Sequence, residues 1–198
     1  MLNYKNIIFD FGNVIAEYNE DYIFRQFCAD AKDLPTMAQA ILPTWPQLDY
    51  GSLDYQEVKE QAMQSVPSHL TEAVENFYDN WYRCLLPIKE IWSLIEELHN
   101  LRIPLYILSN APTLFAAKAD YYEITKKFTG ILFSAPLKMG KPNPDFYRYL
   151  FDTYSLIPEE CFFIDDRSDN IMAGRSLGMD GIVFSGDVQA VRRAIGLP

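Results

Sequence analysis

Residues 6–15 of the chain read NIIFDFGNVI, a short apolar run that ends in an aspartate and a glycine-containing turn. The run is typical of a buried strand, and it places Asp10 where that strand ends. In an open α/β sheet, ligands bind outside the carboxyl ends of the strands. A carboxylate buried there is costly unless a cation or strong donors compensate its charge. We therefore interpret Asp10 as a metal ligand, a nucleophile or both; the alternative is that it only caps the turn.

The rest of the chain repeats this pattern and predicts an α/β fold. Short runs rich in Ile, Leu, Phe and Val occupy residues 104–109, 130–134, 161–165 and 181–185. Apolar residues at helical spacing fall between them, over residues 87–101, 145–156 and 170–177, and Pro144 suits the start of a helix. Strands that alternate with helices form parallel sheets. We expect a Rossmann-like parallel sheet of five strands with helices on both faces.

Residues 17–86 differ from the rest of the chain. They contain helical patterns over residues 21–31, 34–41, 52–66 and 71–86 and no convincing strand, with breaks at 43–46, 50–52 and 67. A helical insert directly after the first strand predicts a small cap over the ligand end of the sheet. The alternative is that it packs as part of one core. We expect an α/β core domain of residues 1–16 and 87–198 and a helical cap domain of residues 17–86.

Composition restricts the function further. The 198 residues are 49% hydrophobic, and their formal net charge is −10. Nucleic-acid and anionic-membrane binding rest on basic surfaces, so we expect neither, and an anionic small substrate needs a local positive site. Three widely spaced cysteines without a CxxC motif predict reduced thiols rather than disulfides or a zinc site. With no signal-peptide pattern and no apolar run of transmembrane length, we expect a cytoplasmic protein.

Three later segments place polar residues where chemistry is expected. Ser109 and Asn110 end the second apolar run, and a hydroxyl with free backbone N–H groups can hold a phosphoryl oxygen there, although Ser-Asn is also ordinary turn chemistry. Lys141 lies between a glycine and a proline, in a loop stiffer than a solvent-facing lysine needs. Asp165 and Asp166 end the fourth run, and a divalent cation commonly offsets the repulsion of adjacent carboxylates.

In this order, the four segments resemble the four motifs of the haloacid dehalogenase-like hydrolase superfamily. The resemblance covers nearly the whole chain, and the insert resembles the family's small C1-type cap. Residues 165–179, DDRSDNIMAGRSLGM, are the most specific part. The first motif is most similar to that of the α-D-glucose-1-phosphate phosphatase group and of the phosphatase domain of soluble epoxide hydrolases.

The resemblance implies an Mg²⁺-dependent phosphatase that forms an aspartyl-phosphate intermediate. Oxygen ligands suit Mg²⁺, and a lysine suits the role of a point charge beside a phosphate. By resemblance, the nucleophile is Asp10, the metal ligands are Asp10, Asp166 and the carbonyl of Gly12, the phosphate-binding groups are Ser109, Asn110 and Lys141, Lys141 also serves catalysis, and Asp165 and Asn170 orient the metal site.

The chain departs from the family pattern at Gly12, where most of the family's phosphatases carry an acid that protonates the leaving group. Losing such a group typically costs on the order of 10²–10⁴ in rate. One interpretation is a phosphatase that tolerates the loss, with a sugar 1-phosphate among the candidate substrates and the proton coming from a metal-bound water or Glu17. A second is a 2-haloacid dehalogenase, against which Asp165 and Asp166 argue. A third is a non-catalytic protein that binds a phosphorylated ligand.

We expect the phosphatase, with a small phosphorylated metabolite as its substrate and a monomer or weak homodimer as its assembly. The insert should select the substrate, and residues 45–53 form a candidate specificity loop. We expect Trp45 in that loop to pack between helices. Arg25, Lys59 and Arg83 are candidates for binding a second anionic group, but exposed helix positions are the commoner place for such side chains.

Overall fold

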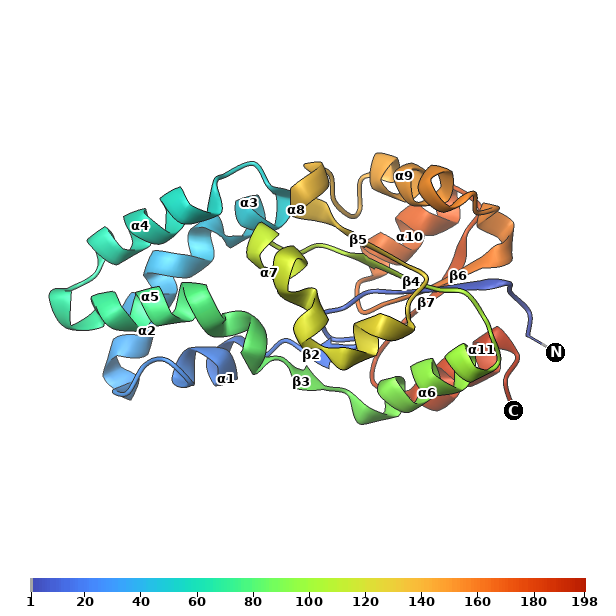
Figure 1. The fold of residues 1–198 in the computed structure, drawn as a ribbon, viewed down its shortest axis with the longest axis horizontal. Coiled ribbons are helices and arrows are strands. Elements are labelled where there is room, and N and C mark those ends of the chain that lie inside the picture. The colour runs from blue at the N-terminus through green and yellow to red at the C-terminus, as the bar shows by residue number, and fades with distance from the viewer. Residues whose placement is uncertain (1) are drawn as a thin grey trace.

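The computed structural model describes residues 2–198, and its centre is a parallel sheet (Figure 1). The strand order is β5-β4-β1-β6-β7, and every neighbouring pair runs parallel. The strands are β1 Asn6–Phe9, β4 Leu105–Ser109, β5 Gly130–Phe133, β6 Cys161–Asp165 and β7 Asp180–Val183. The α/β fold and its five-stranded sheet are confirmed, with each predicted strand end within two residues of the observed one.

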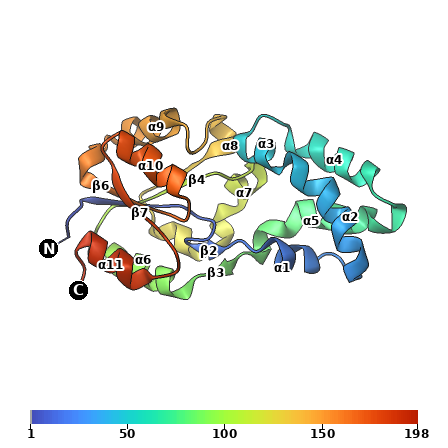
Figure 2. The same cartoon turned by 180° about the vertical axis from the view of Figure 1, so that it is seen from behind.

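The central strand β1 is buried on both faces, which explains its unbroken apolar sequence. Ile7 and Phe9 pack into one hydrophobic cluster, and Ile8 between them packs into another on the opposite face. Helices α6 and α11 cover the first face, and α9 and α10 cover the second (Figures 1 and 2). The sheet therefore has helices on both faces, as predicted.

The helices of this part of the chain begin where the sequence offers caps. The Asn143 side chain accepts a hydrogen bond from the backbone N–H of Asp145, and Pro144 occupies the first turn, which needs no N–H partner. The helices are α6 Lys89–Asn100, α7 Thr113–Lys118, α8 Ser134–Leu137, α9 Pro144–Tyr154, α10 Ser168–Ser176 and α11 Val188–Ile195. The sequence patterns did not predict α7, α8 or α11.

The residues between the first two strands of the sheet form a separate group of helices beyond the carboxyl ends of the strands (Figure 1). Within this fully described stretch, no strand occurs between residues 20 and 84. The helices are α1 Glu20–Arg25, α2 Leu34–Ile41, α3 Trp45–Tyr50, α4 Tyr55–Ser65 and α5 Thr71–Asn80. We call residues 17–86 the helical region; its lid function is a proposal.

Three predictions for the helical region were imprecise, and prolines explain two of them. The break expected around residues 43–46 is the start of α3, because Pro46 lies in the first turn of a helix. The helix expected to reach residue 86 ends at Asn80, and the chain extends before Pro87, where a helical conformation is disfavoured. The first helix ends at Arg25, six residues before the predicted end.

The two chain crossings between the sheet and the helical region are paired. Strand β2, Ala16–Glu17, lies antiparallel to β3, Leu86–Pro87. The carbonyl of Ile15 accepts a hydrogen bond from the backbone N–H of Ile88 at 3.1 Å and from Nε1 of Trp92 at 3.0 Å. These contacts fix the entry and exit of the helical region at one place next to the end of β1.

Two further sequence predictions concern the chain as a whole. Among residues 2–198, no helix is long and apolar enough to cross a membrane. The three cysteines are free thiols, with Cys28 and Cys161 buried and Cys84 partly buried. The prediction that they are core residues rather than disulfide partners is confirmed for Cys28 and Cys161.

Candidate active site

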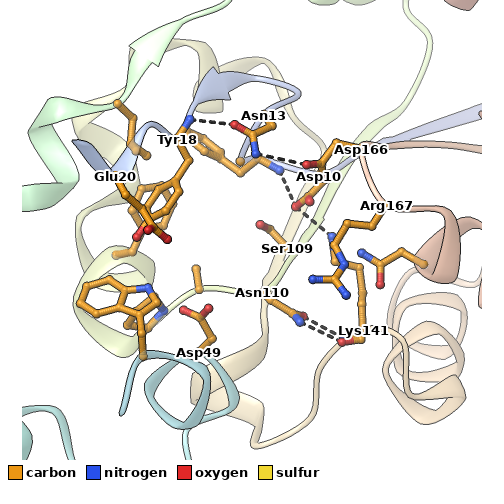
Figure 3. Close-up of a pocket in the computed structure, with 18 of the residues that line it drawn as sticks. Asp10, Asn13, Tyr18, Glu20, Asp49, Ser109, Asn110, Lys141, Asp166 and Arg167 are labelled. Carbon is orange, nitrogen blue, oxygen red and sulfur yellow. Dashed lines mark hydrogen bonds and ion pairs between the residues drawn. The ribbon is translucent and has the colours of Figure 1, made fainter. Parts of the chain in front are cut away.

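A cavity of about 460 Å³ lies between the carboxyl ends of the strands and the helical region (Figure 3). The strand ends bring together residues that are more than 150 positions apart in the sequence. Seven of the eight predicted site residues line the cavity: Asp10, Gly12, Ser109, Asn110, Lys141, Asp166 and Asn170. The eighth, Asp165, lies below the cavity and contacts Lys141.

Lys141 is the cation at the floor of the cavity. Its Nζ lies 2.8 Å from Oδ1 of Asp10 and 2.7 Å from Oδ2 of Asp165, and its side chain is 1% exposed. Burial acts to lower the pKa of Lys141, but the two carboxylates outweigh it, so the pKa is raised above its ordinary value. Lys141 is therefore positively charged and can bind an anion in the cavity.

Asp10 is buried at the end of β1. Burial raises its pKa to about 6, while the ion pair with Lys141 and the Ser109 hydroxyl act in the opposite direction. The backbone N–H of Phe11 donates to Asp10 Oδ1 at 2.7 Å. An opposing cation and a backbone donor thus hold the carboxylate in a fixed orientation, as a nucleophile requires.

Asp165 has a supporting position. Its side chain is fully buried and accepts hydrogen bonds from Nδ2 of Asn170 at 2.9 and 3.0 Å. The backbone N–H of Arg167 donates to it at 2.8 Å, and Lys141 completes the set. Asp165 therefore orients Lys141 and the start of α10, and the role expected for Asp165 and Asn170 in orienting a metal site stays a prediction.

The loop that carries Lys141 is held by the side chain of Asn110. Nδ2 of Asn110 donates to the carbonyl of Lys141 at 2.9 Å, and the N–H of Lys141 donates to Oδ1 of Asn110 at 2.8 Å. A Cβ at Gly140 would lie 3.0 Å from Oδ1 of Asn110, so a glycine permits this close approach. Asn110 thus couples the ends of β4 and of the lysine loop.

The acidic residues at the cavity floor fit a divalent cation. Asp10, Asp165 and Asp166 each offer a carboxylate oxygen, and these oxygens lie within 4.8 Å of one another. Lys141 pairs with the first two, whereas Asp166 accepts a hydrogen bond only from Nδ2 of Asn13, at 3.1 Å, among the described residues. The floor therefore keeps excess negative charge and hard oxygen donors, which suit Mg²⁺.

Sequence reasoning missed Asn13, which organises the turn after β1. Its backbone adopts a left-handed conformation with φ of 55°, and Oδ1 accepts the backbone N–H of Tyr18 at 2.9 Å. The signal was present, because asparagine tolerates this conformation better than most residues and follows a glycine here. Asn13 thus links Asp166 to the start of the helical region.

Residues 4–178 match the haloacid dehalogenase-like hydrolase family. The chain belongs to this family. It is 28% identical over 181 residues to a sesquiterpene phosphatase of Aspergillus oryzae, a match that covers 90% of this chain and 89% of the relative. It is also 26% identical over 191 residues to a D-ribitol-5-phosphate phosphatase of Bacteroides thetaiotaomicron, with 89% of each chain covered.

A solved structure shares the fold of this hydrolase. A HAD family enzyme of Bacteroides thetaiotaomicron, crystallised as a magnesium complex, superposes with a TM-score of 0.73 at 19% identity and covers 96% of this chain and 98% of its own. This likeness shows the fold, and the family match over residues 4–178 confirms the predicted family. The narrower resemblance to the α-D-glucose-1-phosphate phosphatase group stays a prediction.

The wall of the cavity opposite the carboxylates is aromatic and acidic. Trp45, Trp81 and Phe115 line it and pack on one another, with ring centroids 5.1 and 5.6 Å apart. Trp45 packs between helices, as predicted. Two acids, Glu20 and Asp49, also line this wall of the hydrolase, and no sequence motif had singled them out.

The three basic residues considered for a second anion do not line the cavity. Arg25 pairs with Asp21, and Arg83 lies against the rings of Tyr82 and Tyr121. The expectation of an exposed position is wrong for Lys59, whose side chain is buried between α4 and α5 because Asp79 and Glu75 pair with it. Glu17, a candidate proton donor, is exposed and also lies outside the cavity.

Proposed function

We propose that this hydrolase is an Mg²⁺-dependent phosphatase that cleaves a small phosphorylated metabolite through an aspartyl-phosphate intermediate. The observation that carries the proposal is the buried ion pair of Asp10 and Lys141 at the floor of the cavity, with Asp166 beside it. A pure binding protein has no need of an oriented carboxylate facing its anion. Asp10 is the nucleophile in this account, and Lys141 offsets the charge that it shares with the phosphate.

The phosphoryl group would occupy the space above Asp10. Ser109 and the backbone of Asn110 would bind two of its oxygens, and Lys141 a third. Asp10 then attacks phosphorus, the bond to the alcohol oxygen breaks, and a water later releases inorganic phosphate from Asp10. Asn110 and Asp165 support this step indirectly, because they hold the lysine loop and the lysine side chain.

The cation would be held by Asp10, Asp166 and the carbonyl of Gly12. These ligands would in turn be oriented by Asp165 and Asn170. Mg²⁺ bound there supplies charge neutralisation that lets a phosphate approach a carboxylate. The magnesium complex of the related Bacteroides enzyme and the two phosphatase relatives support this assignment. The adjacent acids Asp165 and Asp166 disfavour a metal-free 2-haloacid dehalogenase.

The helical region, residues 17–86, would act as a cap that covers the alcohol part of the substrate. The cations among the lining residues, Lys141 and Arg167, lie at the phosphate end, whereas Glu20 and Asp49 lie on the opposite wall. A second phosphate or carboxylate on the substrate would meet acids and no cation on that wall. The proposed substrate is therefore a monophosphate whose alcohol part carries no further negative charge, and a sugar 1-phosphate meets this condition.

The test is phosphate release from a panel of phosphorylated metabolites with Mg²⁺ and with EDTA, beside a halide-release assay on 2-chloropropionate. We expect phosphate release that requires the metal and that favours esters of neutral alcohols over bisphosphates. Halide release that persists in EDTA would contradict the proposal and indicate a dehalogenase. Folded protein that is inactive in both assays would indicate a binding role.

A further inference from the structure

Gly12 leaves the active site without an acid at the position where most related phosphatases carry one. One of the two acids on the opposite wall is Asp49, in the last turn of α3. Asp49 lines the same cavity as Asp10, and Figure 3 shows its carboxylate directed into the space across from Asp10. Resting on the proposed function, we propose that Asp49 is the general acid and base of the phosphatase reaction, supplied by the helical region instead of the loop after β1.

The backbone around Asp49 is fixed against the sheet domain. The hydroxyl of Ser134, at the start of α8, donates to the carbonyl of Asp49 and accepts a hydrogen bond from the N–H of Ala111 at 2.9 Å. Ala111 follows the phosphate-binding residues Ser109 and Asn110. The buried Ser134 hydroxyl therefore connects the backbone of Asp49 to the loop that would bind the phosphate.

Gly51 makes the approach of α3 to α8 possible. It ends α3 in a left-handed conformation with φ of 74°, and a Cβ there would lie 2.2 Å from the carbonyl oxygen of Ala135. The two backbones are therefore in direct contact two residues after Asp49. This contact and the Ser134 hydrogen bond set the position of Asp49 relative to Asp10 before any substrate binds.

The carboxylate of Asp49 has no hydrogen-bond donor among residues 2–198, and it is partly buried. Burial, with a smaller contribution from the charge of Asp10, raises the pKa of Asp49 to about 7. A carboxyl that titrates near neutrality can both give and take a proton. The charged side chains that share the cavity with it are Asp10, Asp166, Glu20, Lys141 and Arg167.

Other candidates in the cavity suit the role less well. Tyr18 has a pKa raised above its ordinary value by burial and by the charges of Glu20 and Asp49, so it holds its proton too tightly to act as an acid. Glu20 is exposed to solvent, so nothing shields its carboxyl group. Of the two acids on the opposite wall, Asp49 alone has a shielded carboxyl group.

The proton transfers balance in both half-reactions. In the first, an Asp10 oxygen bonds to phosphorus, the bond from phosphorus to the alcohol oxygen breaks, and the Asp49 proton moves to that oxygen to release the neutral alcohol. In the second, Asp49 accepts a proton from water as the water oxygen bonds to phosphorus. The bond to Asp10 then breaks, which releases inorganic phosphate and restores both carboxyl groups.

The test compares wild type with Asp49→Asn on two esters, the best alkyl ester of the panel and 4-nitrophenyl phosphate, whose leaving group departs without protonation. The readout is kcat/KM across the neutral pH range with Mg²⁺, because kcat/KM reports the first phosphoryl transfer. We expect Asp49→Asn to lower kcat/KM for the alkyl ester by about 10²–10⁴ and to change the nitrophenyl ester by much less. In wild type, kcat/KM for the alkyl ester should decrease on the basic side of neutrality as Asp49 loses its proton. This decrease should be absent in Asp49→Asn.

Asp54→Asn is the matched control, because it removes one negative charge from the same region outside the cavity. Asp54 caps α4 through its side chain, and asparagine caps equally well, so both esters should be cleaved at the wild-type rate. An equal loss on both esters in Asp49→Asn, or an unchanged alkyl ester, would overturn the assignment. Wild-type protein that cleaves neither ester would instead contradict the proposed function itself.

Discussion

Lys141 is the residue that connects the largest part of the active site. Its ammonium group bridges Asp10, at the end of β1, and Asp165, at the end of β6, and its backbone is bound to the Asn110 side chain at the end of β4. The ends of three strands therefore contact one residue. The positive charge stabilises two buried carboxylates, and it remains beside the position where a phosphate would bind.

The raised pKa of Asp49, about 7, has a consequence for stability. Asp49 loses its proton at about pH 4 in the unfolded chain but only at about pH 7 in the folded protein. Between these pH values the unfolded state is favoured, so the stability of the folded protein falls as pH rises from about 4 to about 7. Asp49→Asn removes that effect. We expect the variant, without metal, to gain in melting temperature over wild type at pH 8 but not below pH 4, measured by thermal unfolding. An equal difference in melting temperature between variant and wild type at both pH values would contradict the burial of the Asp49 carboxyl group.

Residues at the ends of apolar runs were predictable from the sequence. From the helical region only the segment 45–53 was expected near the substrate, and neither Asp49 nor Tyr18 was predicted to line the cavity. Asp10, Ser109 and Asp166 directly follow or end strands, and parallel strands bring their carboxyl ends to one edge. Asp49 and Tyr18 reach the cavity only because the helical region folds over it. Their sequence neighbourhoods carry no pattern that specifies this contact.

At the scale of elements, the contact of α3 with α8 determines how the helical region meets the sheet. The contact depends on Gly51, since any side chain there would strike the backbone of Ala135. The sequence indicated a turn at residues 50–52 but not the helix before it. The proline pattern of residues 43–46 is read as a break, yet a proline in a first turn is equally compatible with a helix start.

Gly51→Ala should therefore lower the free energy of unfolding by more than the left-handed backbone conformation alone would cost. Gly186 offers the matched control, because its φ is 93° and a Cβ there would meet nothing within 4 Å. The left-handed conformation costs an alanine roughly 1–2 kcal/mol, which Gly186→Ala should lose in its free energy of unfolding. Gly51→Ala should lose more and should also lower phosphatase activity, as measured by urea unfolding and phosphate release. Equal losses would contradict the close contact of α3 and α8.

At the scale of the whole molecule, the active site lies between two parts of the chain that are joined at β2 and β3. The floor comes from strand ends, and the opposite wall comes from residues 17–86 together with Phe115 of α7. The five parallel strands were predictable, because each is a short, largely apolar run between helical patterns, whereas nothing in the sequence predicted their order in the sheet. The short strands β2 and β3 were not, because two residues carry no periodic pattern.

Metal binding should stabilise the folded molecule as a whole, because a cation offsets the excess charge of Asp10, Asp165 and Asp166. Mg²⁺ at 100 times its dissociation constant would add about 2.7 kcal/mol to the free energy of unfolding. We expect a rise in melting temperature with Mg²⁺ for wild type and none for Asp166→Asn. Asp169→Asn is the control: this acid does not line the cavity, it pairs with Arg167 rather than with the proposed metal ligands, and its loss should leave the rise intact. A rise in Asp166→Asn as large as in wild type would place the cation elsewhere.

The most direct measurement for the central claim is a rapid acid quench with an ester labelled in its phosphoryl group, in wild type and in Asp10→Asn. The account predicts that the label appears on the peptide containing Asp10 before inorganic phosphate accumulates, and that Asp10→Asn forms neither labelled peptide nor phosphate. Phosphate release at the wild-type rate by Asp10→Asn, or label on a different residue, would contradict the account.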